Sequence, residues 1–158
     1  MVLGNWFDLQ KMNDFIIRKY HVDDEKDVID LWSECDLIVP QNDPRLDIER
    51  KLKVNPEWFL VGEFEGKIVA TCMAGYEGHR GWINYLAVAP QYRRKGYATR
   101  IMQETEKILR KAGCPKINLQ VRTSNTSVIK FYKAMGYDID DVVSMGKRLE
   151  HDNLDEVE

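Results

Sequence analysis

The sequence contains little cysteine and histidine, and neither residue type is clustered. Its three cysteines, Cys35, Cys72 and Cys114, include no Cys-x-x-Cys pair. Because an odd number of widely spaced cysteines is typical of a reducing compartment, we expect a cytoplasmic protein without a disulfide framework. The three histidines are equally scattered along the chain. The sequence therefore predicts no metal site.

Long apolar runs and an excess of one charge are also absent. No run approaches the roughly 20 apolar residues of a membrane span, and residues 1–12 lack the apolar core of a signal peptide. The net charge of -3 predicts no attraction to nucleic acid or to an anionic membrane. A length of 158 residues suits one domain. We expect it to span residues 13–150, between a loosely ordered extension at 1–12 and a frayed acidic tail at 151–158.

Hydrophobic spacing predicts alternating helices and strands. Strands are predicted at 15–20, 58–64, 67–76, 82–88, 116–122, 137–143 and 144–149. Helical spacing predicts helices at 24–37, 96–112 and 125–135, and Asp43-Pro44 is a typical start of another helix. This order indicates an α/β fold, with helices on both faces of a mixed sheet.

A basic loop with one glycine connects the strand at 82–88 to the helix at 96–112. Arg93, Arg94 and Lys95 supply positive charge, and Gly96 lets the backbone approach an anion closely. The first N–H groups of a helix lack intrahelical partners and lie at its positive end, so such a segment suits a pyrophosphate. The alternative is a solvated basic loop before an ordinary helix cap. The position between a strand and a helix favours the phosphate site.

Two segments carry a resemblance to a known family. Arg93-Arg94-Lys95-Gly96-Tyr97-Ala98 resembles the Gln/Arg-x-x-Gly-x-Gly/Ala signature of the GNAT acetyltransferases, and the preceding residues 86–90 resemble their strand before it. Downstream, residues 119–125 and 131–137 resemble the second hallmark of that family. The similarity covers about residues 15–149. Four short stretches, 35–37, 42–44, 75–81 and 146–149, are more similar still to the bacterial YpeA-like acetyltransferases.

The resemblance implies a fold and an activity. The fold would be a mixed, mostly antiparallel central sheet flanked by about four helices. The activity would be transfer of an acetyl group from acetyl-CoA to a primary amine of a small molecule or peptide, by direct attack of the amine. Many members of the family are dimers, so a homodimer is the expected assembly.

The resemblance also implies which residues hold acetyl-CoA. Its pantetheine arm would lie where strand 85–88 diverges from residues 118–121, and the Val88 amide would donate a hydrogen bond to the thioester oxygen. Asn125 would cap the helix that follows it and also contact the pantetheine arm. The implied cofactor-binding residues are Leu86, Ala87, Val88, Arg93, Arg94, Lys95, Gly96, Tyr97, Ala98, Thr99, Asn125 and Tyr132.

Tyr132 is the general acid that the resemblance implies, because a phenol with a pKa near ~10 is protonated at neutral pH. The alternative is a buried helix tyrosine with a satisfied hydroxyl. The base is less defined. Gln120 stands where the ribosomal-protein N-terminal acetyltransferases have a glutamate, so that mechanism is not implied. Glu77, His79 or a water chain through Tyr85 would replace it.

The acceptor amine is the least defined part of this prediction. Trp32, Asp36, Asp43, Tyr76 and Glu77 are candidates to select a cationic amine, although the sequence favours cap and turn roles for Asp36 and Asp43 and a core role for Trp32. A catalytically silent acyl-CoA-binding regulatory module is the alternative function. Tyr132 and the intact phosphate loop favour the enzyme, whereas the missing glutamate at Gln120 weakly favours the module. A toxin acting on aminoacyl-tRNA is disfavoured by the acidic balance.

Overall fold

The computed structural model describes residues 14–152, and its centre is a five-stranded sheet in the order β1-β2-β3-β4-β5. The strands are β1 (Phe15–Lys19), β2 (Phe59–Phe64), β3 (Lys67–Tyr76), β4 (Gly81–Val88) and β5 (Ile117–Asn118). The first four pair antiparallel, and β5 pairs parallel to β4. The predicted mixed, mostly antiparallel sheet is therefore confirmed.

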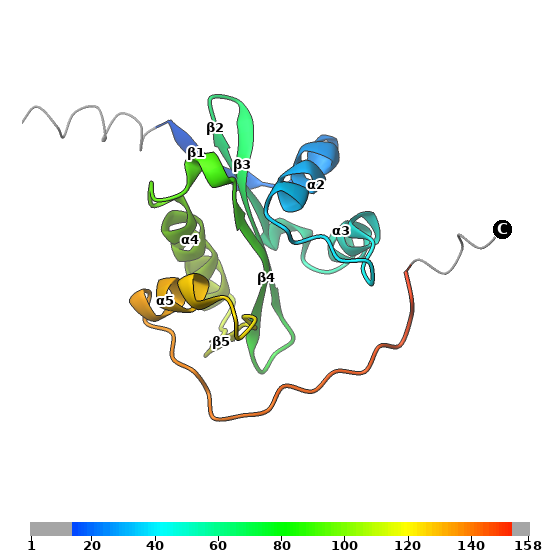
Figure 1. Ribbon diagram of the computed structural model, residues 1–158, viewed down its shortest axis with the longest axis vertical. Helices are drawn as coiled ribbons and strands as arrows, with labels where there is room; N and C mark the ends of the chain where they lie inside the picture. The colour runs from blue at the N-terminus through cyan, green and yellow to red at the C-terminus, as the bar shows by residue number, and fades with distance from the viewer. Residues whose placement is uncertain (1–13, 153–158) are drawn as a thin grey trace, which may run out of the picture.

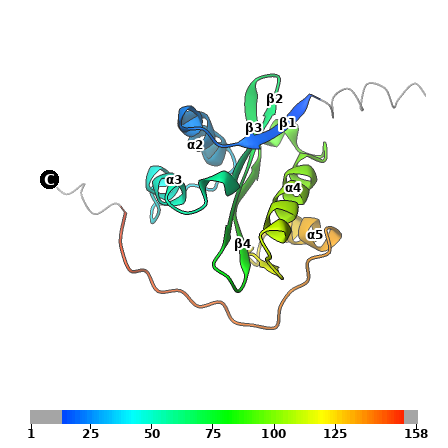
Figure 2. The ribbon, with the colours of Figure 1, turned by 180° about the vertical axis from the view of Figure 1, so that it is seen from behind.

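Helices cover both faces of the sheet, with α2 and α3 on one face and α4 and α5 on the other (Figures 1 and 2). The helices are α2 (Glu25–Glu34), α3 (Pro44–Leu52), α4 (Tyr97–Lys111) and α5 (Thr126–Ala134). Three short 3-10 turns, η1 (Val22–Asp24), η2 (Pro56–Trp58) and η3 (Pro90–Tyr92), complete the described elements. No helix within residues 14–152 is long and apolar enough to cross a membrane.

Local sequence rules explain where several elements begin and turn. The Asp43 carboxylate accepts a hydrogen bond from the Arg45 amide, and Pro44 occupies the first position of α3. Glu65 and Gly66 both have positive φ, as the tight turn between β2 and β3 requires. These caps and turns fix the ends of the elements that carry the candidate site.

One contiguous hydrophobic core lies between the sheet and its helices. Trp32 of α2 and Phe59 of β2 are fully buried on one face, and Ile101, Met102 and Leu109 of α4 are fully buried on the other. The spacing of these three α4 residues is the helical stripe that the sequence indicates. The core thereby holds β3 and β4 from both sides.

The two strands predicted at 137–143 and 144–149 are wrong. After α5 the chain runs as an extended C-terminal arm, residues 138–152, that belongs to no sheet and curves below the body in Figure 1. The predicted strand at 116–122 also shortens to Ile117–Asn118. An alternating apolar pattern forms a strand only where a neighbouring strand supplies backbone partners, and none lies beside the arm within residues 14–152.

The far end of the arm is attached to α3. Arg50 and Asp152 form a salt bridge at 2.7 Å, and the Asp43 amide donates to the Asp152 carboxylate at 3.0 Å. The predicted extension at 1–12, and the predicted tail beyond residue 152, lie outside the described residues.

Candidate active site

Strands β4 and β5 pair at one end only. Gly81 lies opposite Ile117 and Trp82 opposite Asn118, whereas β4 continues to Val88 with no further strand partner on that side among residues 14–152. Residues 119–122 are outside any strand. The two segments therefore diverge along most of β4 and leave a row of backbone groups available for a ligand.

A bulge in β4 lies within the stretch that has diverged from β5. The register between β3 and β4 shifts there, and Tyr85 has a φ of 51°. A hydrogen-bonded chain holds this backbone, because Trp32 Nε1 donates to Thr71 Oγ1 at 2.9 Å and Thr71 Oγ1 donates to the Tyr85 carbonyl at 2.8 Å. The Tyr85 ring stacks on Trp32 with centroids 3.8 Å apart. The bulge is thus built from buried contacts on the α2 side.

The ladder between β3 and β4 fixes the direction of the Val88 amide. The Ala89 amide donates to the Val69 carbonyl at 2.8 Å, so the backbone groups of Ala89 point toward β3. Antiparallel pairs alternate between bonded and non-bonded, so the amide and carbonyl of Val88, opposite Ala70, point away from β3. The Val88 carbonyl accepts hydrogen bonds from Arg93 Nε at 3.1 Å and Cys35 Sγ at 3.4 Å. Its amide faces the open side of β4.

The basic loop turns sharply into α4. Arg94 and Gly96 have φ values of 61° and 80°, and Gly96 is the N-cap of α4 without any side-chain cap. Left-handed residues in such a turn direct successive amides toward one concavity, which is a common anion site. Residues 93–96 are exposed. The loop therefore presents uncapped helix amides and basic side chains together.

The residues near this loop differ in what they offer a ligand, which is either a charged side chain or a backbone amide. Tyr97 is buried and stacks on Phe15 with ring centroids 4.0 Å apart, so only its backbone is available for a ligand. Lys95 lies over the Tyr92 ring at 5.8 Å. Ala98 and Thr99, in the first turn of α4, are partly buried. Basic charge thus comes from the loop, and the helix contributes amides.

Asn125 and Tyr132 both come from α5, as its N-cap and as a buried residue within it. The Asn125 side chain accepts a hydrogen bond from the Val128 amide, which confirms the predicted cap. Tyr132 is 8% exposed and lies against Phe131 and Tyr137, with centroids 5.1 Å and 5.5 Å away. Burial raises the pKa of Tyr132 above its ordinary value. Its hydroxyl is therefore fully protonated at neutral pH.

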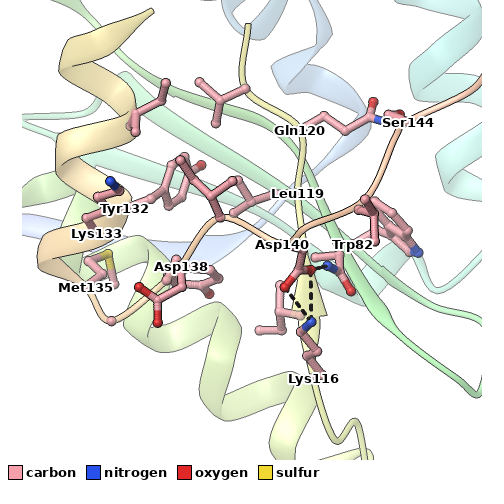
Figure 3. A pocket seen from close by; sticks show the side chains of 18 of the residues that line it. Trp82, Lys116, Leu119, Gln120, Tyr132, Lys133, Met135, Asp138, Asp140 and Ser144 are labelled. Carbon is pink, nitrogen blue, oxygen red and sulfur yellow. Dashed lines mark hydrogen bonds and ion pairs between the residues drawn. The ribbon is translucent and has the colours of Figure 1, made fainter. Parts of the chain in front are cut away.

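Tyr132 also lines a large cleft beside β5. The cleft has a volume of about 1350 Å³ and lies between residues 116–123, α5 and the C-terminal arm. In Figure 3, Tyr132 points across this cleft toward Leu119. Gln120 donates to the Ser144 hydroxyl of the arm, at the rim of the same cleft.

The structure does not bring Glu77 and His79 to the Val88 end of β4. Both lie in the connection between β3 and β4, where the Glu77 carboxylate accepts hydrogen bonds from the His79 and Arg80 amides at 3.0 Å and 2.6 Å. Val88 is at the opposite end of the eight-residue strand. At about 3.3 Å per residue, that separation is ~23 Å along the strand.

The candidate acceptor residues are also separated. Trp32 is fully buried in the core, and Asp43 caps α3. Asp36 has a φ of 57°, as in a turn after α2. The Tyr76 hydroxyl, in the same end of the sheet as Glu77, donates to the Gly78 and Gly113 carbonyls. Each of these four residues has a structural role.

Asp47 of α3 is a further residue of this site that the sequence does not indicate. Its carboxylate accepts a 2.6 Å hydrogen bond from the Tyr85 hydroxyl and lies 3.3 Å from Arg50. The contact links α3 to the bulge in β4, and burial together with this carboxylate raises the pKa of Tyr85. No local signal marks Asp47, because Tyr85 lies 38 residues away in the chain.

Comparison with known proteins agrees with these features. Residues 25–137 match the model of the "Acetyltransferase (GNAT) family". The chain is 49% identical over 133 residues to an acetyltransferase of Yersinia pestis, covering 84% of this chain and 94% of that protein. It is also 49% identical over 137 residues to an acetyltransferase of Sodalis glossinidius, covering 86% and 96%.

Solved structures share the fold at low identity. One is AAC(6')-Iy in complex with a bisubstrate analogue, with a TM-score of 0.70, 17% identity, and coverage of 85% of this chain and 98% of that one. Another is a putative acetyltransferase from Agrobacterium tumefaciens, with a TM-score of 0.70, 16% identity, and coverage of 84% and 99%.

Proposed function

This chain belongs to the acetyltransferase (GNAT) family and is an acyltransferase, and from that premise we propose the reaction that it catalyses. It transfers the acetyl group of acetyl-CoA to a primary amine of a small molecule or peptide, by direct attack of the amine. The pyrophosphate binds at the N-terminus of α4, and the pantetheine arm lies between β4 and the segment after β5. A cytoplasmic location and a homodimer complete the proposal.

The observation that carries this proposal is the direction of the Val88 amide. It faces the open side of β4, which has no strand partner beyond Trp82 among the described residues. An amide in that position donates to the thioester oxygen, and it stabilises the negative charge that develops there during attack. Such a donor contributes about 2.7–4 kcal/mol to lowering the barrier.

Tyr132 supplies the second chemical group. As the amine nitrogen bonds to the carbonyl carbon, the carbon–sulfur bond breaks and the sulfur leaves as a thiolate. The Tyr132 hydroxyl, which is protonated at neutral pH, donates its proton to that sulfur and is reprotonated from solvent before the next turnover. A general acid in this role accelerates a reaction by roughly a hundredfold or more.

The proton of the attacking amine leaves on the side of β4 that faces α3. The Tyr85 hydroxyl and the Asp47 carboxylate form a 2.6 Å hydrogen bond there, between the bulge and α3. Asp47 attracts a cationic amine, and water bound to this pair carries the proton away. Glu77 and His79 would have to act over the length of β4, so we place the relay at Tyr85 and Asp47.

Two measurements with the purified protein test the proposal. Calorimetry with acetyl-CoA measures occupancy of the groove, and release of free thiol with a panel of amines, amino sugars and short peptides measures transfer. We expect binding and amine-dependent thiol release. Absence of binding contradicts the groove itself. Binding without thiol release from any amine identifies instead a silent acyl-CoA-binding module.

A further inference from the structure

The far end of the C-terminal arm carries a carboxylate that is bound from two places. Asp152 accepts hydrogen bonds from the Arg50 guanidinium at 2.7 Å and 3.1 Å, and from the Asp43 amide at 3.0 Å. Its side chain is only 2% exposed, so water competes little for these contacts. In Figure 1 the arm ends on the α3 side of the molecule. The arm is therefore attached to the helix that carries Asp47 of the proposed proton relay.

Arg50 binds two carboxylates unequally. Its two terminal nitrogens donate to both oxygens of Asp152, the forked arrangement in which Arg–carboxylate pairs are strongest. Its contact with Asp47 is one hydrogen bond of 3.3 Å, which is longer than the usual range. Residues three apart on a helix are neighbours, so Asp47 is the partner that Arg50 would take without the arm. Asp152 therefore holds the guanidinium away from Asp47.

The remaining capacity of the Asp47 carboxylate is what the acceptor amine would use. One of its oxygens accepts the 2.6 Å hydrogen bond from the Tyr85 hydroxyl, and the side chain is 22% exposed. A guanidinium bound to this carboxylate in a fork would occupy both oxygens and cancel its charge. Asp47 could then neither attract a cationic amine nor hold the water that carries the proton away.

We propose that Asp152 is a positioning residue for acetyl transfer, because it binds Arg50 and so keeps the guanidinium from neutralising Asp47. This inference rests on the proposed relay at Tyr85 and Asp47. It concerns the amine and not acetyl-CoA, since α3 covers one face of the sheet and the helix that begins at the phosphate loop, α4, covers the other (Figures 1 and 2). A residue 102 positions beyond Arg50 thereby tunes the acceptor side of the site.

Asp152→Asn tests this role by removing the charge that holds Arg50. The guanidinium is then expected to turn to Asp47. With an amine that supports thiol release, we expect kcat/KM for that amine to fall about tenfold, while the affinity for acetyl-CoA in calorimetry stays unchanged. Asp140→Asn is the matched control, because it also separates an aspartate of the arm from a cation, Lys116 at 2.9 Å, but at the β5 end of the arm. Its kcat/KM should stay within about twofold of the wild-type value.

A second substitution separates positioning from a purely structural role. The double variant Asp152→Asn/Arg50→Gln lacks the guanidinium, so Asp47 keeps its charge and kcat/KM should return to within about twofold of the wild-type value. A salt bridge that only fastened the arm predicts no such rescue, because the double variant retains neither charged partner. A double variant as slow as Asp152→Asn would overturn the proposal, and so would a wild-type kcat/KM in Asp152→Asn itself.

Unfolding measurements test the same competition without any acetyl transfer. A double-mutant cycle with Arg50→Gln and Asp47→Asn measures the coupling of these two residues in urea denaturation. We expect that coupling to be at least about doubled in the Asp152→Asn background, because Arg50 then pairs with Asp47 alone. An unchanged coupling would overturn the proposal. Absence of thiol release from the wild-type protein, together with a doubled coupling, would instead contradict the proposed function and leave the control of Arg50 by Asp152 in place.

Discussion

The two edges of β4 differ in what they contact. On the β3 side, β4 pairs with β3 from Gly81 to Val88 apart from the bulge, and its buried side chains belong to the core. On the β5 side, pairing stops after Trp82. One edge is thus satisfied by the protein, and the other leaves backbone groups for a ligand. The same strand can hold the fold with its side chains and bind with its amides.

This comparison separates stability from function in a testable way. Substitutions on the β3 and α2 side should change the free energy of unfolding. Substitutions around the open edge should change cofactor binding or turnover and leave unfolding nearly unchanged. A substitution at the open edge that greatly lowers the free energy of unfolding would contradict this division.

The largest effect is expected from Trp32→Ala. Trp32 is fully buried, stacks on Tyr85 and donates to Thr71, so its removal leaves a cavity and an unpaired hydroxyl acceptor. We expect the free energy of unfolding to fall by about 3–5 kcal/mol in urea denaturation. Trp82→Ala, at a tryptophan that is 40% exposed, is the matched control and should cost far less. Equal losses in the free energy of unfolding in the two variants would contradict the idea that the α2 side of β4 contributes more to stability than its β5 side.

The second effect is on turnover. Tyr132→Phe removes the proposed proton donor, and we expect kcat to fall about a hundredfold while the affinity for acetyl-CoA stays nearly unchanged. Tyr137→Phe is the control, because Tyr137 is a neighbouring phenol whose ring lies against Tyr132. Thiol release and calorimetry measure the two quantities. An undiminished kcat in Tyr132→Phe would exclude Tyr132 from the reaction.

The third effect is on cofactor binding. Gly96→Glu places a negative side chain at the uncapped start of α4, where repulsion should weaken acetyl-CoA binding at least about tenfold. Gly113→Glu, just beyond the other end of α4, imposes a similar cost of positive φ. A Cβ at either glycine would meet no atom within 4 Å. Calorimetry compares the two variants. Equal affinities would place the pyrophosphate elsewhere.

Local rules predicted the parts of the site that depend on neighbouring residues. The glycine turn before α4 and the Asn125 cap follow from backbone preferences within a few residues. The bulge at Tyr85 depends on Trp32, Thr71 and Asp47, which come from three separate elements, so no local pattern indicates it. The geometry of the bulge therefore becomes visible only when these elements are packed together in the fold.

The C-terminal arm shows a different limit of prediction. Its alternation of apolar residues is that of a strand, and the expected extended backbone is present. No strand within residues 14–152 pairs with it. A sequence pattern records which residues suit a strand, and says nothing of whether a neighbouring strand is present to pair with it.

The smallest effect is expected at the corner between β1 and η1. The Asp24 carboxylate accepts hydrogen bonds from Arg18 at 2.7 Å and 2.8 Å and from the His21 amide at 2.7 Å. Asp24→Asn weakens these charge-assisted bonds and should lower the free energy of unfolding by roughly 1–2 kcal/mol at pH 7. Asp23→Asn, at a side chain that is 88% exposed, is the control and should cost less.

The pH dependence of this loss identifies its cause. The hydrogen bonds from Arg18 hold the pKa of Asp24 below its ordinary value of about 3.9. A carboxylate with a lowered folded-state pKa stabilises the protein above its unfolded-state pKa, and that stability is lost as the pH falls through the folded-state pKa. The difference between wild type and Asp24→Asn should therefore be constant from pH 7 to about 5 and shrink below pH 4. Asp152, whose pKa Arg50 lowers to about 2, is present in both proteins and cancels in the comparison. If the difference in the free energy of unfolding stays constant down to pH 3, the stability lost in Asp24→Asn comes from packing and not from the charge of Asp24.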